Sequence, residues 1–217
     1  MVSVAILQAA LFLVKGRGDM TTTENISIVV PADWVSGPQQ GSWTYDDYTR
    51  LPDEGKRYEV VNGVLVMAPA PDLDHQSIAL RISHYLLIHV ELARLGRVFP
   101  APVDVVLGQR DVFQPDVVVV LNAHLDRLAH RKIIGAPDVV VEIASPATAA
   151  YDRLTKYTAY ARAGIAEYWI VKPAAHTVDV LTLEQSEYRS LGIFSGQTML
   201  PSRVIPELPV SVAQFFP

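Results

Sequence analysis

The chain has 217 residues, 50% of them hydrophobic and 19% charged, with a formal net charge of -5, which allows one domain with a substantial core. Because the chain contains no cysteine, disulfides, thiolate zinc sites and cysteine nucleophiles are excluded, and any metal must bind to oxygen or imidazole. The acidic balance argues against a protein that coats nucleic acid through a basic surface.

Residues 1–41 are predicted to form an N-terminal extension, and residues 42–217 the folded domain. The apolar stretch at 1–14 is too short to cross a bilayer, and it lacks the flanking features of a secretory signal. Met20 opens a more ordinary polar N-terminus, so we expect translation to start there. Prolines and glycines at 27–41 favour an arm or linker.

The first elements of the predicted domain are a capped helical turn and a β-hairpin. Thr44 precedes two aspartates in the next three residues, which is typical of a helix N-terminus. Two apolar runs at 58–61 and 64–67 are separated by Asn62-Gly63, and this pair supplies the two positive φ angles of a type I′ turn. Glu59 lies on the first strand of the hairpin, where an acidic side chain usually faces water.

A long helix is predicted to begin at about His75, after Asp72 or Asp74 as its cap, and to end at Gly96. The side chains expected to face the sheet recur at helical spacing, and they are Ile78, Ile82, Tyr85, His89 and Leu92. His75 falls in the first turn, where a side chain can serve a site but is more often simply exposed.

The rest of the chain is rich in strand signals. Strands are predicted at 97–100, 103–107, 112–121, 139–144, 167–171 and 177–183, and a helix at 149–163 with Gly164 as its left-handed cap. Strands joined first by tight turns and then by a helical crossover give a mixed sheet, antiparallel on one side and parallel beyond Ser145. The expected class is therefore α/β (α+β), a mixed central β-sheet flanked by helices, with the β-hairpin as an N-terminal extension.

An acidic residue, Glu142, interrupts the apolar run at 139–144, whose composition is typical of a strand buried on both faces. Burying an ionised carboxylate without a partner costs several kcal/mol. Glu142 therefore needs a cation, a hydrogen-bonded partner or protonation. The alternative is that Glu142 lies at a strand end, with its carboxylate in water or paired with an arginine.

Two neighbouring stretches predict a shared site with Glu142. Asp116 begins the apolar run at 117–121, and the helix after Glu142 carries Asp152, Lys156 and Tyr160 at i, i+4 and i+8. A connection of ordinary loop length favours adjacent pairing of the two strands that carry the acids. If the two carboxylates approach within about 4 Å, their repulsion is about 4 kcal/mol at an effective dielectric of about 20, and only a shared cation or proton relieves it.

Three blocks of sequence, in this order, resemble a known family. They are P-D-V-V-V-V at 115–120, A-P-D-V-V-V-E-I-A-S-P-A-T at 136–148 and Y-D-R-L-T-K-Y-T-A-Y-A-R-A-G-I-A-E-Y-W-I-V at 151–171. From about Tyr45 onward the chain resembles the Uma2 family of putative restriction endonucleases, in the PD-(D/E)XK nuclease superfamily. The lysine that the superfamily pattern places two residues after the acid is replaced here by Ala144, and Uma2-like sequences carry it on the following helix, at Lys156.

The resemblance implies a restriction-endonuclease-like fold and metal-dependent hydrolysis of DNA phosphodiester bonds. Asp116, Glu142 and Lys156 would then be catalytic, with Mg²⁺ or Mn²⁺ held by the two acids. Lys156 would orient the attacking water or stabilise negative charge on the phosphate. DNA is the expected partner, and a homodimer is expected from symmetric double-strand cutting. The supporting candidates for the same site are Glu59, His75 and Tyr160.

Other interpretations of these residues stay open. From spacing alone, Lys156 and Asp152 form an ordinary surface pair. The acidic net charge and Ala144 favour a nucleic-acid- or protein-binding module that has lost cleavage, and a third interpretation is an α/β domain whose acids only form ion pairs. The lack of cysteine and of an export signal fits a bacterial cytoplasm, with no membrane partner. A basic cluster is either a DNA-binding patch or a solvated loop, and it consists of Arg127, His130, Arg131 and Lys132.

Overall fold

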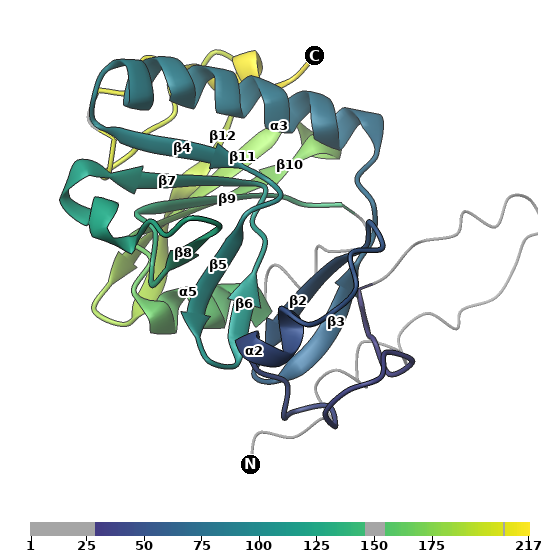
Figure 1. The fold of residues 1–217 in the computed structure, drawn as a ribbon. Helices are drawn as coiled ribbons and strands as arrows, with labels where there is room; N and C mark the ends of the chain where they lie inside the picture. The colour runs from purple at the N-terminus through teal and green to yellow at the C-terminus, as the bar shows by residue number, and fades with distance from the viewer. Residues whose placement is uncertain (1–28, 146–154, 206) are drawn as a thin grey trace, which may run out of the picture.

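The computed structural model describes residues 29–145, 155–205 and 207–217, which form two six-stranded β-sheets with helices packed against them (Figure 1). The predicted start at Met20 lies outside the described residues, as do positions 149–154 of the predicted helix. Within the described ranges, every helix is too short or too polar to cross a bilayer. The predicted mixed α+β class is confirmed.

The first sheet contains the predicted hairpin. Asn62 and Gly63 have φ angles of 50° and 77°, both positive as predicted for this turn. The predicted cap Thr44 begins a short helix, α2 (Tyr45–Tyr48), beside the hairpin. The strand order is β1-β3-β2-β6-β5-β8, with β1 (Val30–Pro31), β2 (Arg57–Val61), β3 (Val64–Ala68), β5 (Asp104–Gly108), β6 (Asp111–Phe113) and β8 (Lys132–Ile134). Because β1 pairs with β3, part of the predicted arm belongs to the sheet.

The second sheet confirms the predicted mixture of strand directions. Its order is β12-β11-β10-β9-β7-β4, with β4 (Gly96–Pro100), β7 (Val117–Leu121), β9 (Val139–Ile143), β10 (Glu167–Lys172), β11 (Thr177–Glu184) and β12 (Glu187–Ser195). β9 and β10 are parallel, and the other neighbouring pairs are antiparallel. The edge strand β12 was not predicted, because most of its side chains are exposed or half-buried and its apolar alternation is weak.

The single strand predicted at 112–121 is wrong, because the chain passes there from one sheet to the other. β6 ends at Phe113 in the first sheet, and β7 begins at Val117 in the second. Pro115 lies between them and has no backbone N–H to donate to a ladder, which favours a break at this point. The break places Asp116 at the junction of the two sheets.

The long helix is divided into α3 (Leu73–Leu86) and a π-helical segment, η1 (Leu87–Leu92), and Asp72 caps it as one of the predicted alternatives. Ile78 and Ile82 are buried as predicted, but the stripe continues through Leu86 and Val90, and the predicted Leu92 is 69% exposed. Residues spaced four apart move gradually around an α-helix, because one turn contains about 3.6 residues. A π-helical turn contains more residues, so it returns the buried residues to the face that packs on the sheet. The prediction of Leu92 as a core residue failed because it assumed α-helical geometry throughout. The helix also ends before Gly96, which begins β4.

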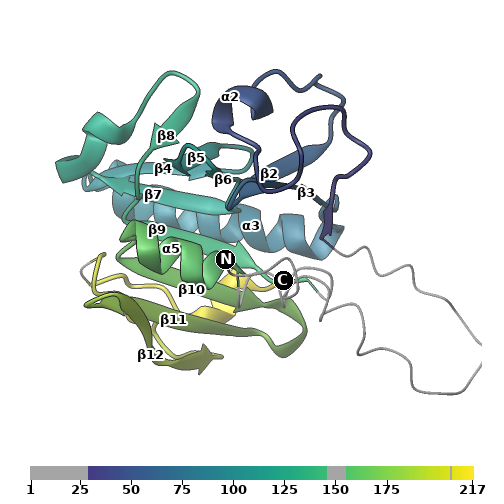
Figure 2. The same cartoon turned by 90° about the horizontal axis from the view of Figure 1, so that it is seen from below.

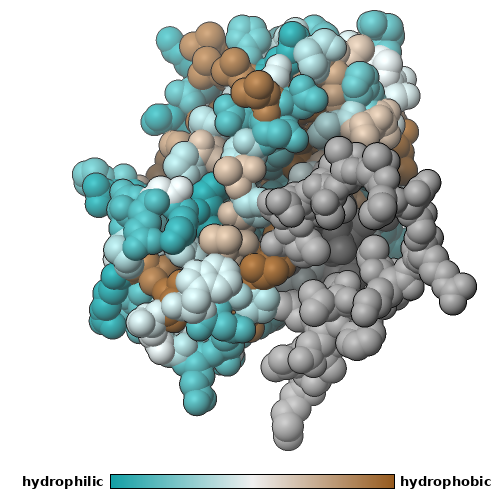
Figure 3. All heavy atoms as spheres, turned by 90° about the vertical axis from the view of Figure 1, so that its right-hand side faces the viewer, coloured by the Kyte–Doolittle hydropathy of each residue, from teal (hydrophilic) through white to brown (hydrophobic). Residues whose placement is uncertain are grey.

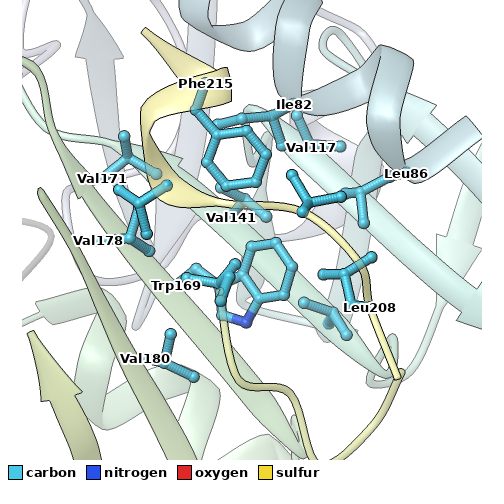
Figure 4. Packing of buried hydrophobic residues seen from close by; sticks show 14 of the residues in the cluster. Ile82, Leu86, Val117, Val141, Trp169, Val171, Val178, Val180, Leu208 and Phe215 are labelled. Carbon is cyan, nitrogen blue, oxygen red and sulfur yellow. The ribbon is translucent and has the colours of Figure 1, made fainter. Parts of the chain in front are cut away.

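The second sheet is covered on both faces, as Figures 1 and 2 show. α3 and the C-terminal segment, with η5 (Val212–Phe215), pack on one face, and Figure 4 shows Trp169 and Phe215 in that core. On the other face lies α5 (Tyr157–Ala163), which ends at the predicted left-handed cap Gly164. Two 3-10 segments, η2 (Asn122–Arg127) and η4 (Pro173–Ala175), complete the described helices. The junction of the two sheets therefore lies close to α5.

Candidate active site

The two predicted acids lie opposite each other on neighbouring strands. In the β7–β9 ladder, Val117 is paired with Val141, so the register extended by one residue places Asp116 opposite Glu142. Opposed residues in an antiparallel pair project from the same face of the sheet. The backbone N–H of Ile143 donates to Asp116 Oδ2 at 2.8 Å, and both acidic side chains are buried. The predicted adjacency of the two strands is confirmed.

Lys156 is a buried residue whose ammonium group lies between two carboxylates. Its Nζ is 2.9 Å from Glu142 Oε1 and 3.2 Å from Glu59 Oε1, and all three side chains are buried. Glu59 also accepts a hydrogen bond from the Gln114 N–H at 2.8 Å. This burial excludes the interpretation of Lys156 as a surface partner of Asp152, which itself lies outside the described residues. Glu59 likewise faces the site and not water.

Tyr160, one helical turn after Lys156, holds the same carboxylate. Its hydroxyl donates to Glu142 Oε1 at 2.7 Å from a fully buried position. Burial raises the pKa of Tyr160 well above its usual value, and the nearby charges of Glu142 and Glu59 raise it further. The phenol therefore stays protonated and acts as a fixed hydrogen-bond donor to Glu142.

Two basic side chains, His75 and Arg57, lie next to Asp116. His75 Nε2 lies 3.1 Å from Asp116 Oδ2, and Arg57 Nη1 lies 3.9 Å from Oδ1. Burial alone raises the pKa of Asp116, but the His75 hydrogen bond and charge, the Ile143 N–H and the charge of Lys156 outweigh it and lower the pKa below its usual value. Arg57 was not singled out from the sequence, although it stands two residues before Glu59 on the same face of β2.

The lowered pKa of Asp116 predicts a specific pH dependence of stability. A carboxyl group with a depressed folded-state pKa stabilises the fold above its unfolded pKa of about 3.9, and this contribution is lost as the pH falls through the lower folded value. We expect wild type to be more stable than Asp116→Asn at pH 7 and the difference to shrink below about pH 4. Urea unfolding at a series of pH values measures it, with the exposed Asp126→Asn as control. A difference that is constant with pH would contradict the expectation.

An open cleft adjoins this buried cluster through His75. The cleft has a volume of about 500 Å³, and its walls include Asp72, His75, Ser145, Lys172 and His176. The His75 side chain lines the cleft and also contacts Asp116, so it connects the two carboxylates with the open space. A substrate bound in the cleft would therefore meet the site at its His75 side.

The donor set is chemically suited to a hard divalent cation. Asp116 and Glu142 offer carboxylate oxygens from opposed strand positions, and carboxylates are the ligands that Mg²⁺ and Mn²⁺ prefer. In the described part of the chain, no three acidic or histidine side chains converge around one point. Each of the two acids also contacts a basic side chain, because Lys156 lies against Glu142 and His75 lies against Asp116. The residues fit a metal held by two carboxylates, with further ligands from water or substrate.

The comparison with known families identifies the chain. Residues 45–213 match the Uma2 family, described as "Putative restriction endonuclease". This chain belongs to the Uma2 family. The resemblance seen in the three sequence blocks is therefore confirmed, and the match contains every candidate site residue, from Glu59 on β2 to Tyr160 on α5.

A solved structure with a similar fold comes from Anabaena variabilis ATCC 29413. It is a crystal structure described as a putative nuclease belonging to DUF820, and it is 23% identical to this Uma2 chain with a TM-score of 0.68. The similarity covers 80% of this chain and 97% of that one. No curated protein matches the chain. At this level of identity the structural likeness establishes the fold, which is the fold expected from the sequence.

The basic cluster of this Uma2 protein is divided between structural and exposed residues. The guanidinium group of Arg127 donates to the carbonyl of Ala136, and Lys132 Nζ lies 4.1 Å from the centre of the Tyr45 ring. His130 and Arg131 are exposed. Two of the four residues therefore help to hold η2 and β8 in place, and the other two face solvent as in the loop interpretation.

Proposed function

We propose that this Uma2 protein is a metal-dependent endonuclease that hydrolyses DNA phosphodiester bonds. The observation that carries the proposal is the buried Lys156 ammonium, which lies between Glu142 and Glu59 beside a second acid, Asp116. Buried ionisable groups are costly, and a buried lysine with acids beside an open cleft is an arrangement typical of functional sites. The family description supports the same reaction class.

The proposed roles follow from the contacts of each side chain. Asp116 and Glu142 would hold Mg²⁺ or Mn²⁺, and the bound ion would polarise the phosphate and lower the pKa of a water molecule. Lys156 would orient that water or stabilise negative charge on the phosphate. Tyr160 would keep the Glu142 carboxylate in position through its hydrogen bond. Glu59 would orient Lys156 from the opposite side.

The cleft is the proposed binding place for the DNA strand. Lys172 contributes a cationic side chain to its wall, and His75 lies where the cleft meets Asp116. Because the chain has a net charge of -5, attraction to phosphate must come from such local groups and from the metal. A cytoplasmic location, where an enzyme of this kind would meet DNA, is part of the same proposal.

A second candidate function is a catalytically inactive nucleic-acid- or protein-binding module on the same fold. The observation that favours it is the pairing already present in the site, where the Lys156 ammonium contacts both the Glu142 and the Glu59 carboxylates. A buried ion-pair network of this kind can be structural. The two candidates differ in whether phosphodiester bonds are cut.

Cleavage of a random-sequence DNA library tests the proposed function, because it needs no knowledge of a recognition sequence. We expect nicks or cuts with Mg²⁺ or Mn²⁺, none with a chelator, and less cleavage as salt rises, since phosphate contacts release counterions. Glu142→Gln should abolish cleavage, and the surface variant Glu187→Gln, whose side chain is exposed, should cut at the wild-type rate. If wild type and Glu142→Gln cleave the library to the same extent, the binding module is favoured.

A further inference from the structure

The outer face of α3 and η1 carries a line of exposed apolar side chains, interspersed with exposed polar residues such as Arg81 and His84. The core face of this helix is formed by Ile78, Ile82, Leu86 and Val90. On the other side, the exposed fractions are Leu73 82%, Leu80 72%, Leu87 41%, Ile88 37%, Leu92 69% and Leu95 38%. The first three are spaced seven residues apart, so they lie on one face of the helix. Figure 1 shows this helix along the upper edge of the molecule, outside the second sheet.

The arrangement is unusual for a surface helix. Single exposed leucines are common on soluble proteins, whereas five exposed apolar side chains along one helix, with Leu95 just beyond its end, are of the kind that marks an interaction site. Helix residues 73–92 span about 30 Å at 1.5 Å per residue, so the line runs the length of an ordinary helix–helix contact. Figure 3, seen from the side where α3 begins, shows some hydrophobic residues among hydrophilic ones on the upper part of the molecule.

We propose that the occupant of this face is the same face of a second copy of the chain, in an antiparallel two-fold contact. The charges at the two ends of the line favour this arrangement. Asp72 and Asp74 are exposed at its beginning, and Arg94 and Arg97 are exposed at its end. A two-fold axis near His84, the midpoint of the line, places the acidic end of one copy against the basic end of the other.

An antiparallel contact also brings apolar residues onto apolar residues. About the same axis, Leu73 meets Leu95 of the other copy, and Leu80 meets Ile88. The two helix macrodipoles then run in opposite directions, which is the favourable orientation, whereas a parallel pair would bring like charges together at both ends. The two ends of the face are therefore complementary in charge, and two pairs of apolar side chains meet between them. This inference concerns assembly and does not depend on the proposed nuclease activity.

Sedimentation velocity of the full chain over a range of concentrations tests the proposal. Wild type is expected to be a dimer at micromolar concentration, and Leu80→Glu and Ile88→Glu are each expected to raise the dimer Kd by about 100-fold or more, because each places an unpaired charge against an apolar side chain. The matched control is Ile193→Glu on β12, which is 58% exposed and away from the helix, and which should leave the mass unchanged. Circular dichroism of every variant verifies that it is folded.

A charge exchange tests the antiparallel register. Asp74→Arg and Arg94→Asp should each weaken the dimer, since each brings like charges together, and the double variant should recover most of the wild-type affinity because the pair is restored with its signs reversed. A wild-type protein that is monomeric at all concentrations would overturn the proposal. A dimer unaffected by Leu80→Glu and Ile88→Glu, or a double charge variant weaker than both single variants, would overturn it as well.

Discussion

Replacing Lys156 with alanine is expected to slow DNA cleavage by about 10²- to 10⁴-fold and to lower the free energy of unfolding by about 3–5 kcal/mol. The first effect follows if the Nζ atom acts on the water or on the phosphate. The second follows from burial, because removal of the ammonium leaves Glu142 and Glu59 as two buried carboxylates with no cation between them. A surface pair would contribute only about 0.3–0.5 kcal/mol.

The two effects can be separated by restoring the net charge of the Glu59–Lys156–Glu142 cluster without restoring the amine. In Lys156→Met combined with Glu59→Gln, one carboxylate charge is removed together with the ammonium, and much of the lost stability should return. Cleavage should stay slow, because methionine can neither donate a hydrogen bond nor carry charge. Urea unfolding and single-turnover cleavage measure the two quantities. Recovery of the rate together with stability would show that Lys156 is structural.

Arginine at the same position distinguishes the two catalytic roles. Lys156→Arg keeps a positive charge near Glu142, but its head is wider and planar and it cannot lose a proton. Full cleavage by Lys156→Arg would exclude proton transfer and leave charge stabilisation. Full cleavage by Lys156→Ala, measured where the variant is folded, would exclude any catalytic role.

Calorimetric titration with Mn²⁺ is expected to show one site, which Asp116→Ala and Glu142→Ala each abolish. The two carboxylates lie at opposed positions of neighbouring strands, so a shared ion needs both of them. The loss of Mn²⁺ affinity should exceed the roughly 10- to 100-fold loss that typically follows substitution of a residue that only supports a metal ligand. Each variant should be compared by thermal unfolding, since Glu142 also holds Lys156 and Tyr160.

Exposed acids serve as the matched controls for this titration. Asp126→Ala and Glu187→Ala remove carboxylates from η2 and β12, where the side chains face solvent, and they should leave Mn²⁺ binding unchanged. Tyr160→Phe is a milder probe, because it keeps both carboxylates and removes only the hydrogen bond to Glu142. It should weaken binding without abolishing it. Unchanged affinity in both Asp116→Ala and Glu142→Ala would eliminate the proposed metal site.

Sequence signals within a few residues correctly predicted the local structure wherever a short segment determines its own conformation. The Asn62-Gly63 turn needs two positive φ angles, and the chain adopts them. Gly164 ends α5 in the left-handed conformation, and Thr44 and Asp72 cap their helices, for equally local reasons. The neighbourhood of Asp116 and Glu142 was also predictable, because both stand at corresponding ends of strongly apolar strands that pair.

The arrangement of the other site residues depends on contacts between segments that are distant in the sequence. Spacing on a helix shows that Lys156 and Tyr160 share a face, but only the packing of α5 on the sheet turns that face toward Glu142. The approach of Glu59 depends on how the first sheet meets the second, and that meeting depends on the break at Pro115. Arg57 reaches Asp116 for the same reason.

Most of the strands and the turns could be predicted from the sequence, because periodicity, capping and turn chemistry act over a few residues. The family and the identity of the acids could be predicted from the three sequence blocks. The tertiary structure alone decided that Lys156 is buried between two carboxylates, that His75 borders a cleft, and that a second apolar face of α3 is exposed. Burial depends on which residues pack against a side chain, and those residues lie tens of positions away in the chain. A single sequence does not show which distant residues come into contact.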